Sequence, residues 1–222
     1  NFGHNPLHPP LIESTGLANE RSVLKKALTF NDYEPGLIEI GALAGFCFDN
    51  ELPRHRVYLA PFSLANRLVT NEEYLAFMED GGYHRPELWL SEGWSHCQQQ
   101  AWNHPLYWHW RDGEWCEYRF DGLHPLVSNA PVVHVSGYES SAFAAWSNAR
   151  LPTEFEWEHA SSFELELEGN FAERNLLHPQ PRNTCHSQMF GDVWEWTSSH
   201  YGPYPGYQPL PGVLGEYNGK FM

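Results

Sequence analysis

Three segments of this 222-residue chain carry the same helix-start signal, a Ser or Thr followed three residues later by Glu. In such a capping box, the hydroxyl oxygen accepts a hydrogen bond from a free backbone N–H, and the carboxylate accepts one from the N–H of the capping residue. We therefore predict three helices, each beginning directly after its Ser or Thr. The three pairs are Thr70 with Glu73, Ser136 with Glu139, and Thr153 with Glu156.

The helix after Ser136 is predicted to have one apolar face. Its small and aromatic side chains recur at helical spacing, and small residues favour close packing against a sheet. The residues of this predicted face are Tyr138, Ala142, Ala145, Trp146 and Ala149.

Short strands and turns are predicted around these helices. Residues 107–110 and 115–118 flank Asp112-Gly113, a dipeptide typical of tight hairpins because glycine accepts a positive φ. Apolar alternation predicts further strands, and Pro, Gly and Tyr predict a late loop. The further strands are residues 37–40, 55–59, 132–135 and 192–197, the loop is 200–212, and a short helix is expected near 20–28.

Large rings and many turn residues set the expected fold class. Aromatic residues make up 15% of the chain, which also contains 18 Gly and 17 Pro. This composition favours short elements joined by shaped turns over long Leu-rich helices. We expect one mixed α/β (α+β) domain with short strands and much loop.

Charge and cysteine usage exclude several kinds of partner and compartment. The formal net charge of −15 repels phosphate backbones and anionic lipids, so we expect neither nucleic acid nor a membrane as a partner. Cys47, Cys97, Cys116 and Cys185 are scattered and form no CxxC pair. Because the chain shows no export signal and no long apolar run, we expect reduced thiols in a soluble cytoplasmic protein.

No metal site is predicted from the 13 histidines. An iron site needs several ligands converging on one point with open positions left for substrates. His4 and His8 are four residues apart, but the prolines between and after them prevent a helix from presenting both on one face. His178 and His186 flank a loop, and we interpret them as solvent-exposed.

Glu154 and Glu158 lie one helical turn apart, a spacing that a pair of acid–base catalysts could use. The first turn of a helix offers a simpler explanation, because acids there interact favourably with free N–H groups and with the helix dipole. We therefore interpret these carboxylates as structural.

Two segments resemble the paired signature of formylglycine-generating-enzyme-like (sulfatase-modifying factor) domains. They are residues 150–158 (RLPTEFEWE) and 191–197 (GDVWEWT). Other runs are similar to the iron-dependent sulfoxide synthases of ergothioneine biosynthesis, and the similarity extends over nearly the whole chain. These runs are residues 49–51, 53–57, 69–71, 73–74, 81–83, 85–90 and 215–222.

The resemblance implies a C-type-lectin-related fold over residues 36–222, preceded by a connector (1–35) from an N-terminal DinB-like helical bundle and followed by a further segment beyond residue 222. It implies an oxidoreductase that uses Fe(II) and O₂ to join the sulfur of cysteine or γ-glutamylcysteine to hercynine as a sulfoxide. In that family the iron-binding histidines belong to the DinB-like bundle. We therefore expect the Fe(II) ligands to lie outside this chain, and the chain alone to be inactive.

The resemblance also suggests site residues. Tyr217 and Phe221 lie in the segment that approaches the iron pocket in the family, and the Tyr217 hydroxyl is the candidate catalytic proton donor. Hercynine carries a trimethylammonium group, which aromatic faces attract. Trp89 and Trp94 are therefore candidate substrate-binding residues together with Phe221, although core packing is the simpler explanation for any single tryptophan.

Three alternatives remain open. A related synthase would join cysteine to unmethylated histidine, as in ovothiol biosynthesis. A formylglycine-generating enzyme would need a reactive cysteine pair, which the scattered cysteines do not recreate. A non-catalytic binding module would keep the fold without the chemistry, because fold alone does not fix function.

Overall fold

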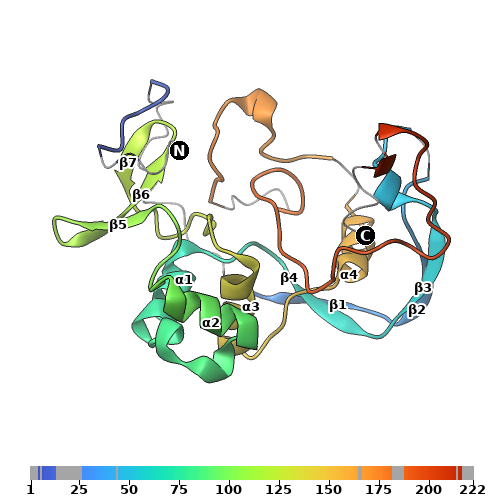
Figure 1. Cartoon of the computed structure of the whole chain (residues 1–222), viewed down its shortest axis with the longest axis horizontal. Coiled ribbons are helices and arrows are strands. Elements are labelled where there is room, and N and C mark those ends of the chain that lie inside the picture. The colour runs from blue at the N-terminus through green and yellow to red at the C-terminus, as the bar shows by residue number, and fades with distance from the viewer. Residues whose placement is uncertain are drawn as a thin grey trace. The chain divides into compact units, whose positions relative to one another are not determined.

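The computed structural model describes residues 5, 7–13, 27–43, 45–164, 167–181, 188–213 and 215–216, and Figure 1 labels the helices and strands. The chain divides into two compact units, each assembled from segments far apart in the sequence. The first comprises Asn1–Thr29, Ala65–Leu151 and Glu166–Trp196, and the second comprises Phe30–Leu64, Pro152–Leu165 and Thr197–Met222. No helix in the described ranges has the length and apolar character needed to cross a bilayer.

Three helices surround the buried aromatic core of the first unit. They are α1 (Asn71–Glu79), α2 (Ser91–Gln99) and α3 (Gly137–Trp146), with the 3₁₀ turns η3 (Gly82–His84) and η4 (Pro86–Leu88) between α1 and α2. Large rings fill this core, in keeping with the composition. Its buried side chains are Tyr74, Phe77, Tyr83, Trp89, Cys97, Trp108 and Ala142.

All three predicted capping boxes are present. The backbone N–H of each Glu donates to the hydroxyl oxygen three residues earlier, and each carboxylate accepts from the N–H of the Ser or Thr in return. α1, α3 and, in the second unit, α4 (Glu154–Ser161) therefore begin where the sequence predicts. The N–H to hydroxyl distances are 3.4 Å for Glu73–Thr70, 3.2 Å for Glu139–Ser136 and 3.1 Å for Glu156–Thr153.

The buried stripe of α3 differs from the predicted face. Ala142 and Ala144 are buried, whereas Ala145 and Ala149 are exposed. Asn148, which follows the end of the helix, adopts a left-handed φ of 56°, so Ala149 lies beyond the helix. α3 also packs against α1 and α2, whereas the sequence predicted packing against a sheet.

A three-stranded antiparallel sheet completes the first unit. Its strands are β5 (Trp108–Arg111), β6 (Glu114–Arg119) and β7 (Gly122–Pro125), in that order. β5 and β6 form the predicted hairpin, and Asp112 and Gly113 in its turn have positive φ angles of 50° and 89°. A short 3₁₀ turn, η5 (Ala172–Arg174), lies in the late segment of this unit.

Among its described residues, the second unit contains two separate two-stranded sheets and the helix α4, and residues 213 and 215–216 are also helical. β1 (Phe30–Tyr33) pairs with β4 (Phe62–Ala65), and β2 (Gly36–Ile40) pairs antiparallel with β3 (His55–Leu59). β2 and β3 confirm the strands predicted at 37–40 and 55–59. A 3₁₀ turn, η2 (Asp49–Glu51), precedes β3, and α4 contacts both β2 and β3.

Two predicted strands do not form. Residues 132–135 are not a strand, because His134 adopts a left-handed φ of 62° that interrupts an extended run. Residues 192–197 do not form a strand either. The loop predicted at 200–212 is confirmed, and the helix expected near 20–28 lies outside the described residues except for 27 and 28, which are not helical.

Glu139 links the start of α3 to the buried core. Its Oε2 accepts from the Ser136 N–H (2.7 Å), and its Oε1 accepts from the Tyr83 hydroxyl (2.5 Å), which lies 3.0 Å from the Tyr74 hydroxyl. Glu139 and Tyr83 are only 4% and 2% exposed. Burial, together with Tyr74 and Glu139, raises the pKa of Tyr83, so its hydroxyl stays protonated as a donor.

We expect Glu139→Ala to lower the free energy of unfolding by about 2–4 kcal/mol, because a cap is lost and the buried Tyr83 hydroxyl loses its acceptor. Glu139→Gln is the matched control, since its amide oxygen keeps the capping box and its NH₂ group can donate to Tyr83 Oη. Urea unfolding measures the free energy of unfolding of both variants. An equal decrease for Glu139→Ala and Glu139→Gln would contradict this role of Glu139.

Candidate functional site

A carboxylate is buried in the sheet of the first unit. Glu117, on the central strand β6, is 1% exposed. The strand register places Trp108 of β5 and His124 of β7 on either side of it. An ionised carboxylate in such a position is costly unless oppositely charged groups surround it.

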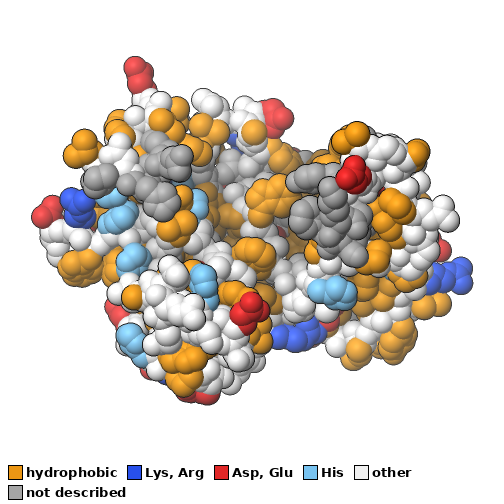
Figure 2. Space-filling view, in the orientation of Figure 1, with side chains coloured by type: hydrophobic (Ala, Val, Ile, Leu, Met, Phe, Trp, Pro, Cys, Tyr) orange, Lys and Arg blue, Asp and Glu red, His pale blue; other side chains and the backbone are white. Residues whose placement is uncertain are grey.

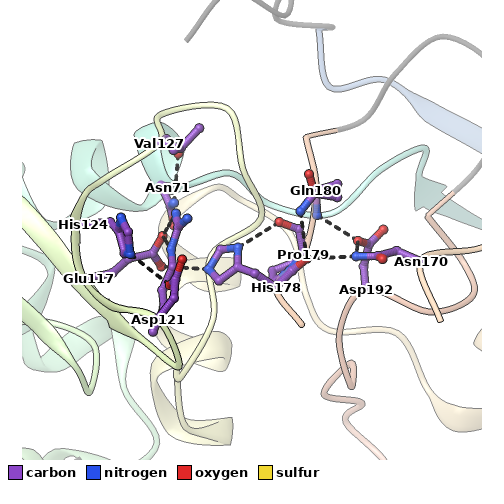
Figure 3. Close-up of polar contacts among 11 residues, drawn as sticks. Asn71, Glu117, Asp121, His124, Val127, Asn170, His178, Pro179, Gln180 and Asp192 are labelled. Atoms are coloured by element: carbon purple, nitrogen blue, oxygen red, sulfur yellow. Dashed lines mark hydrogen bonds and ion pairs between the residues drawn. The ribbon is translucent and has the colours of Figure 1, made fainter. Parts of the chain in front are cut away.

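Arg119 supplies an opposite charge and His178 a second polar partner, and we call these two residues and Glu117 the Glu117 cluster. Arg119 donates from Nε (2.7 Å) and from Nη2 to Glu117 Oε1. His178 Nε2 lies 3.3 Å from Glu117 Oε2, within ion-pair distance although outside hydrogen-bond geometry (Figure 3). The side chains of Arg119 and His178 are 10% and 9% exposed, so water screens both pairs weakly.

The second ring nitrogen of His178 contacts a backbone carbonyl. Nδ1 lies 3.0 Å from the carbonyl oxygen of Pro179, which can only accept, so Nδ1 carries a proton. In a neutral ring, the lone pair of Nε2 would then face the Glu117 carboxylate, and the two would repel each other. His178 Nε2 therefore forms an ion pair with Glu117 when the ring is protonated.

The Glu117 cluster holds a fixed negative charge. Burial by itself raises the pKa of Glu117, but the contacts with His178 and Arg119 outweigh burial and hold the pKa below its ordinary value of 4.5. Burial lowers the pKa of the neighbouring His134, an effect that the charge of Glu117 opposes. A carboxylate with a lowered pKa that is held by Arg119 and His178 suits positioning better than proton transfer.

Hydrogen bonds fix the loop that carries His178. Asp192 Oδ1 accepts from Asn170 Nδ2 (2.9 Å) and from the Gln180 N–H (2.9 Å). Asn170 Nδ2 also donates to the carbonyl oxygen of His178 (2.9 Å). Figure 3 shows these contacts running on from the His178–Glu117 pair. The loop is thus joined to the sheet through His178 and to residue 192 through Asn170 and Gln180.

The Glu117 cluster was not predicted from the sequence. The interpretation of His178 as solvent-exposed is wrong, because its side chain is 9% exposed. The usable signal was a charged residue between Cys116 and Tyr118 in a predicted strand, and all three residues are buried. Since neighbouring strand residues point to opposite faces, both faces of β6 are covered here. His186 lies outside the described residues.

The second unit has a polar cluster of its own around Gly41. The Gly41 N–H donates to Glu158 Oε1 (2.7 Å), and Arg54 Nη1 donates to Gly41 O (2.6 Å). Gly41 has a φ of 103°, and a Cβ there would lie 2.8 Å from the carbonyl oxygen of Glu51, so the position requires glycine. Burial raises the pKa of Glu158, and the Gly41 hydrogen bond partly opposes this effect.

The neighbouring Glu154 also has a structural partner. Its Oε1 accepts a hydrogen bond from the Tyr204 hydroxyl (3.0 Å), which ties the loop after residue 200 to α4. Glu154 and Glu158 therefore both hold parts of the second unit together, in agreement with their interpretation as structural carboxylates.

The two candidate tryptophans lie together in the first unit. Trp89 is 7% exposed, its ring centroid lies 5.5 Å from that of Tyr83 and 6.5 Å from that of Trp94, and its Nε1 donates to a backbone carbonyl (2.9 Å). Core packing accounts for Trp89, whereas Trp94 is partly exposed against the core. Substrate binding by either stays a prediction. Tyr217 and Phe221 lie outside the described residues.

Within the described residues, no group of three or more His, Cys, Asp or Glu side chains could hold a metal ion. His8 contacts the rings of His109 (4.2 Å between centroids) and Tyr118 (4.9 Å), and His4 lies outside the described ranges. This part of the chain therefore offers no ligand set for the Fe(II) that the resemblance implies.

The described cysteines are free thiols. Cys97 and Cys116 are buried, and Cys47 is partly exposed. Burial raises the pKa of both Cys97 and Cys116. Since the thiolate is the nucleophile, these two residues do not form an activated pair. Cys185 lies outside the described residues.

We expect Glu117→Gln to lower the free energy of unfolding by about 3–5 kcal/mol, because Arg119 and His178 would lose their buried counter-ion. Glu114→Gln, at an exposed position of the same strand, is the matched control and should change stability by no more than about 0.5 kcal/mol. Denaturant unfolding of both variants at neutral pH checks this. A loss for Glu117→Gln no larger than that of the control would contradict an ionised, paired Glu117.

The stability difference between the unaltered chain and Glu117→Gln should depend on pH. The pKa of Glu117 is lowered in the folded chain, so its contribution is fully present above the ordinary value of 4.5 and is lost as the pH falls through the lowered pKa. Unfolding curves at a series of acidic pH values should therefore converge for the two proteins. A constant difference down to strongly acidic pH would contradict the lowered pKa.

Comparison with known proteins shows that the chain is similar to two hercynine oxygenases. Hercynine oxygenase of Mycobacterium tuberculosis is 35% identical over 197 residues, which cover 78% of this chain and 45% of that protein. Hercynine oxygenase of Mycolicibacterium smegmatis is 36% identical over 197 residues, with the same shares. The chain thus spans less than half the length of these relatives.

A second kind of relative shares the domain. The formylglycine-generating enzyme of Streptomyces coelicolor is 28% identical over 205 residues, which cover 72% of this chain and 64% of that protein. The sequence profile of the sulfatase-modifying factor enzyme 1-like domain matches residues 32–187, well over half of the chain. The described structure is mixed α/β, with short strands and capped helices. The chain therefore belongs to the sulfatase-modifying factor enzyme 1-like domain family.

Proposed function

We propose that this chain forms the substrate-pocket part of an O₂-dependent oxidoreductase that joins the sulfur of cysteine or γ-glutamylcysteine to hercynine as a sulfoxide. The observation that carries the proposal is the 35% and 36% identity to two hercynine oxygenases, compared with 28% to a formylglycine-generating enzyme. A C-type-lectin-related arrangement of the domain belongs to the same proposal.

Fe(II) is proposed as the cofactor of a longer protein, held by histidines of a DinB-like helical bundle. The match covers 45% of each hercynine oxygenase, so those proteins have room for a further domain. Bound iron would supply the activation of O₂ and a binding position for the thiol. The residues of this chain would supply the pocket wall and orient hercynine.

Tyr217, Phe221 and Trp94 are the proposed pocket residues of this chain. Aromatic faces would hold the trimethylammonium group of hercynine, with Trp94 favoured over Trp89 because part of its ring is exposed. The Tyr217 hydroxyl would donate a proton at the reacting oxygen and favour sulfoxide formation over simple oxidation of the thiol.

The state of two cysteines argues against the formylglycine-generating alternative. That chemistry needs a reactive cysteine pair, but Cys97 and Cys116 are buried and have raised pKa values. The ovothiol-type synthase and the non-catalytic module differ from the proposal in which ligand the protein binds, so a binding experiment separates them.

We expect calorimetry on the longer protein to show hercynine binding about 2- to 30-fold more tightly than histidine, the range that a cation–π contact of about 0.5–2 kcal/mol supports. Trp94→Leu should remove part of this preference, while Trp110→Leu, at a ring on β5, is the control and should keep it. Equal binding of histidine and hercynine would favour the ovothiol-type reaction, and binding of neither would favour a non-catalytic module.

The 222-residue chain alone, supplied with Fe(II), O₂, hercynine and a thiol, is expected to form no sulfoxide, because the proposal assigns the iron-binding histidines to a DinB-like bundle of a longer protein. Product analysis by mass spectrometry measures this. Turnover by the chain alone would refute the proposal that the iron ligands lie elsewhere in a longer protein.

A further inference from the structure

Residues 8–12, which we call the strap, contact the three-stranded sheet of the first unit (Figure 1). The Tyr118 hydroxyl of β6 donates to Pro9 O (2.7 Å). The Leu11 N–H (2.7 Å) and the Ile12 N–H (3.3 Å) both donate to Phe120 O, in the turn between β6 and β7. These contacts involve the backbone of the strap, so they fix its path along the sheet.

Two histidine rings meet where the strap contacts β5. The ring centroid of His8 lies 4.2 Å from that of His109 and 4.9 Å from that of Tyr118. His8 has a left-handed φ of 45°, which is uncommon for a residue other than glycine. The strap therefore adopts an uncommon backbone conformation at the residue whose ring contacts His109.

The strap contacts the face of the sheet opposite to Glu117. His109 and Cys116 are paired across β5 and β6, and Tyr118 lies two residues after Cys116, so all three share one face. His109 is half-buried, and Tyr118 is only 4% exposed. Release of the strap would therefore expose the rings of His109 and Tyr118 to water.

The charges that act on His109 from the described residues are all positive. They come from His8 on the strap, from His104 ahead of β5 and from Arg111 on β5. Burial is the largest effect, and these three charges add to it, so the pKa of His109 lies below its ordinary value of 6.5.

The titratable groups of β6 on this face stay neutral near that pH. Burial raises the pKa of Cys116, and the carboxylates Glu114 and Asp112 of the hairpin raise it further. Burial also raises the pKa of Tyr118. The two histidines are therefore the groups of this contact whose charge changes in mildly acidic solution.

We propose that protonation of His8 and His109 releases the strap, so that residues 8–12 are docked on the sheet at neutral pH and undocked in mildly acidic solution. Two protonated imidazoles in contact repel each other, and the half-buried one also loses hydration. Because the pKa of His109 is lowered in the docked chain, docking is fully favoured above 6.5 and weakens as the pH falls below that value.

This pH-dependent docking uses none of the proposed iron or hercynine chemistry. In the longer protein of the proposed function, residues 1–35 are the connector from the helical bundle, and release of the strap would loosen that connection. This consequence rests on the proposed function, whereas the docking equilibrium itself belongs to the 222-residue chain.

Amide hydrogen exchange of the chain, followed by NMR at pH values on either side of 6.5, tests the release. The protection factors of the Leu11 and Ile12 amides, which correct for the intrinsic exchange rate, should fall by roughly threefold or more at the lower pH. The Tyr118 N–H, which donates to Tyr107 O (2.9 Å), is the internal control and should keep its protection. Unchanged protection of the strap, or an equal fall at Tyr118, would overturn the proposal.

Substitutions separate the charge of the rings from their packing. His8→Asn removes the titratable group, and Asn tolerates a left-handed φ. We expect this variant to reduce the fall in strap protection, and His8→Asn combined with His109→Gln to abolish it while protection above 6.5 is retained. His84→Asn, at an exposed histidine on η3, is the matched control and should leave the fall unchanged.

Two results with the double variant would overturn the proposal. One is a fall in strap protection as large as that of the unaltered chain. The other is loss of strap protection already above 6.5, because docking would then depend on the rings themselves and not on their charge. Hercynine binding enters none of these measurements, so their outcome is separate from that of the proposed function.

Discussion

The core of the first unit depends on one carboxylate that has two roles. Glu139 completes the cap of α3 and, with its other oxygen, accepts the hydrogen bond of the buried Tyr83 hydroxyl. A capping carboxylate usually makes only local contacts near the surface. Here Glu139 also contacts Tyr83 in the turn that follows α1, and the Tyr83 hydroxyl contacts Tyr74 on α1 itself. The start of one helix therefore fixes where another helix and a turn must lie.

Two further acidic residues join segments that are distant in sequence. Both do so through side-chain contacts and not through helix or sheet hydrogen bonds. Glu117 connects a strand with the loop of His178, and Glu158 connects α4 with the tight turn at Gly41. A chain with short strands has few backbone ladders to hold its loops. Buried and half-buried carboxylates take over that task here, and each one requires its own donors or cations because burial of an unpaired charge is costly.

What could be predicted from the sequence was local. The capping boxes and the Asp112-Gly113 turn each depend on residues within a few positions, and both formed as expected. A left-handed residue such as His134 leaves no trace in an apolar alternation, so a strand was wrongly predicted there. The partnership of Glu117 with His178 depends on chain segments brought together only by folding, and no spacing rule reports it. The sequence also does not distinguish the buried ring of Trp89 from the partly exposed Trp94, because burial depends on the folded chain.

The burial of Cys97 and Cys116 has a consequence for a protein proposed to handle a thiol and oxygen together. Disulfide exchange proceeds through the thiolate and needs access to the sulfur. Cys97 is 0% and Cys116 7% exposed, and the Cys97 thiol donates a weak hydrogen bond to Trp102 O (3.7 Å). Small thiols in solution would therefore form mixed disulfides with these two positions only slowly, and the partly exposed Cys47 is more open to such exchange.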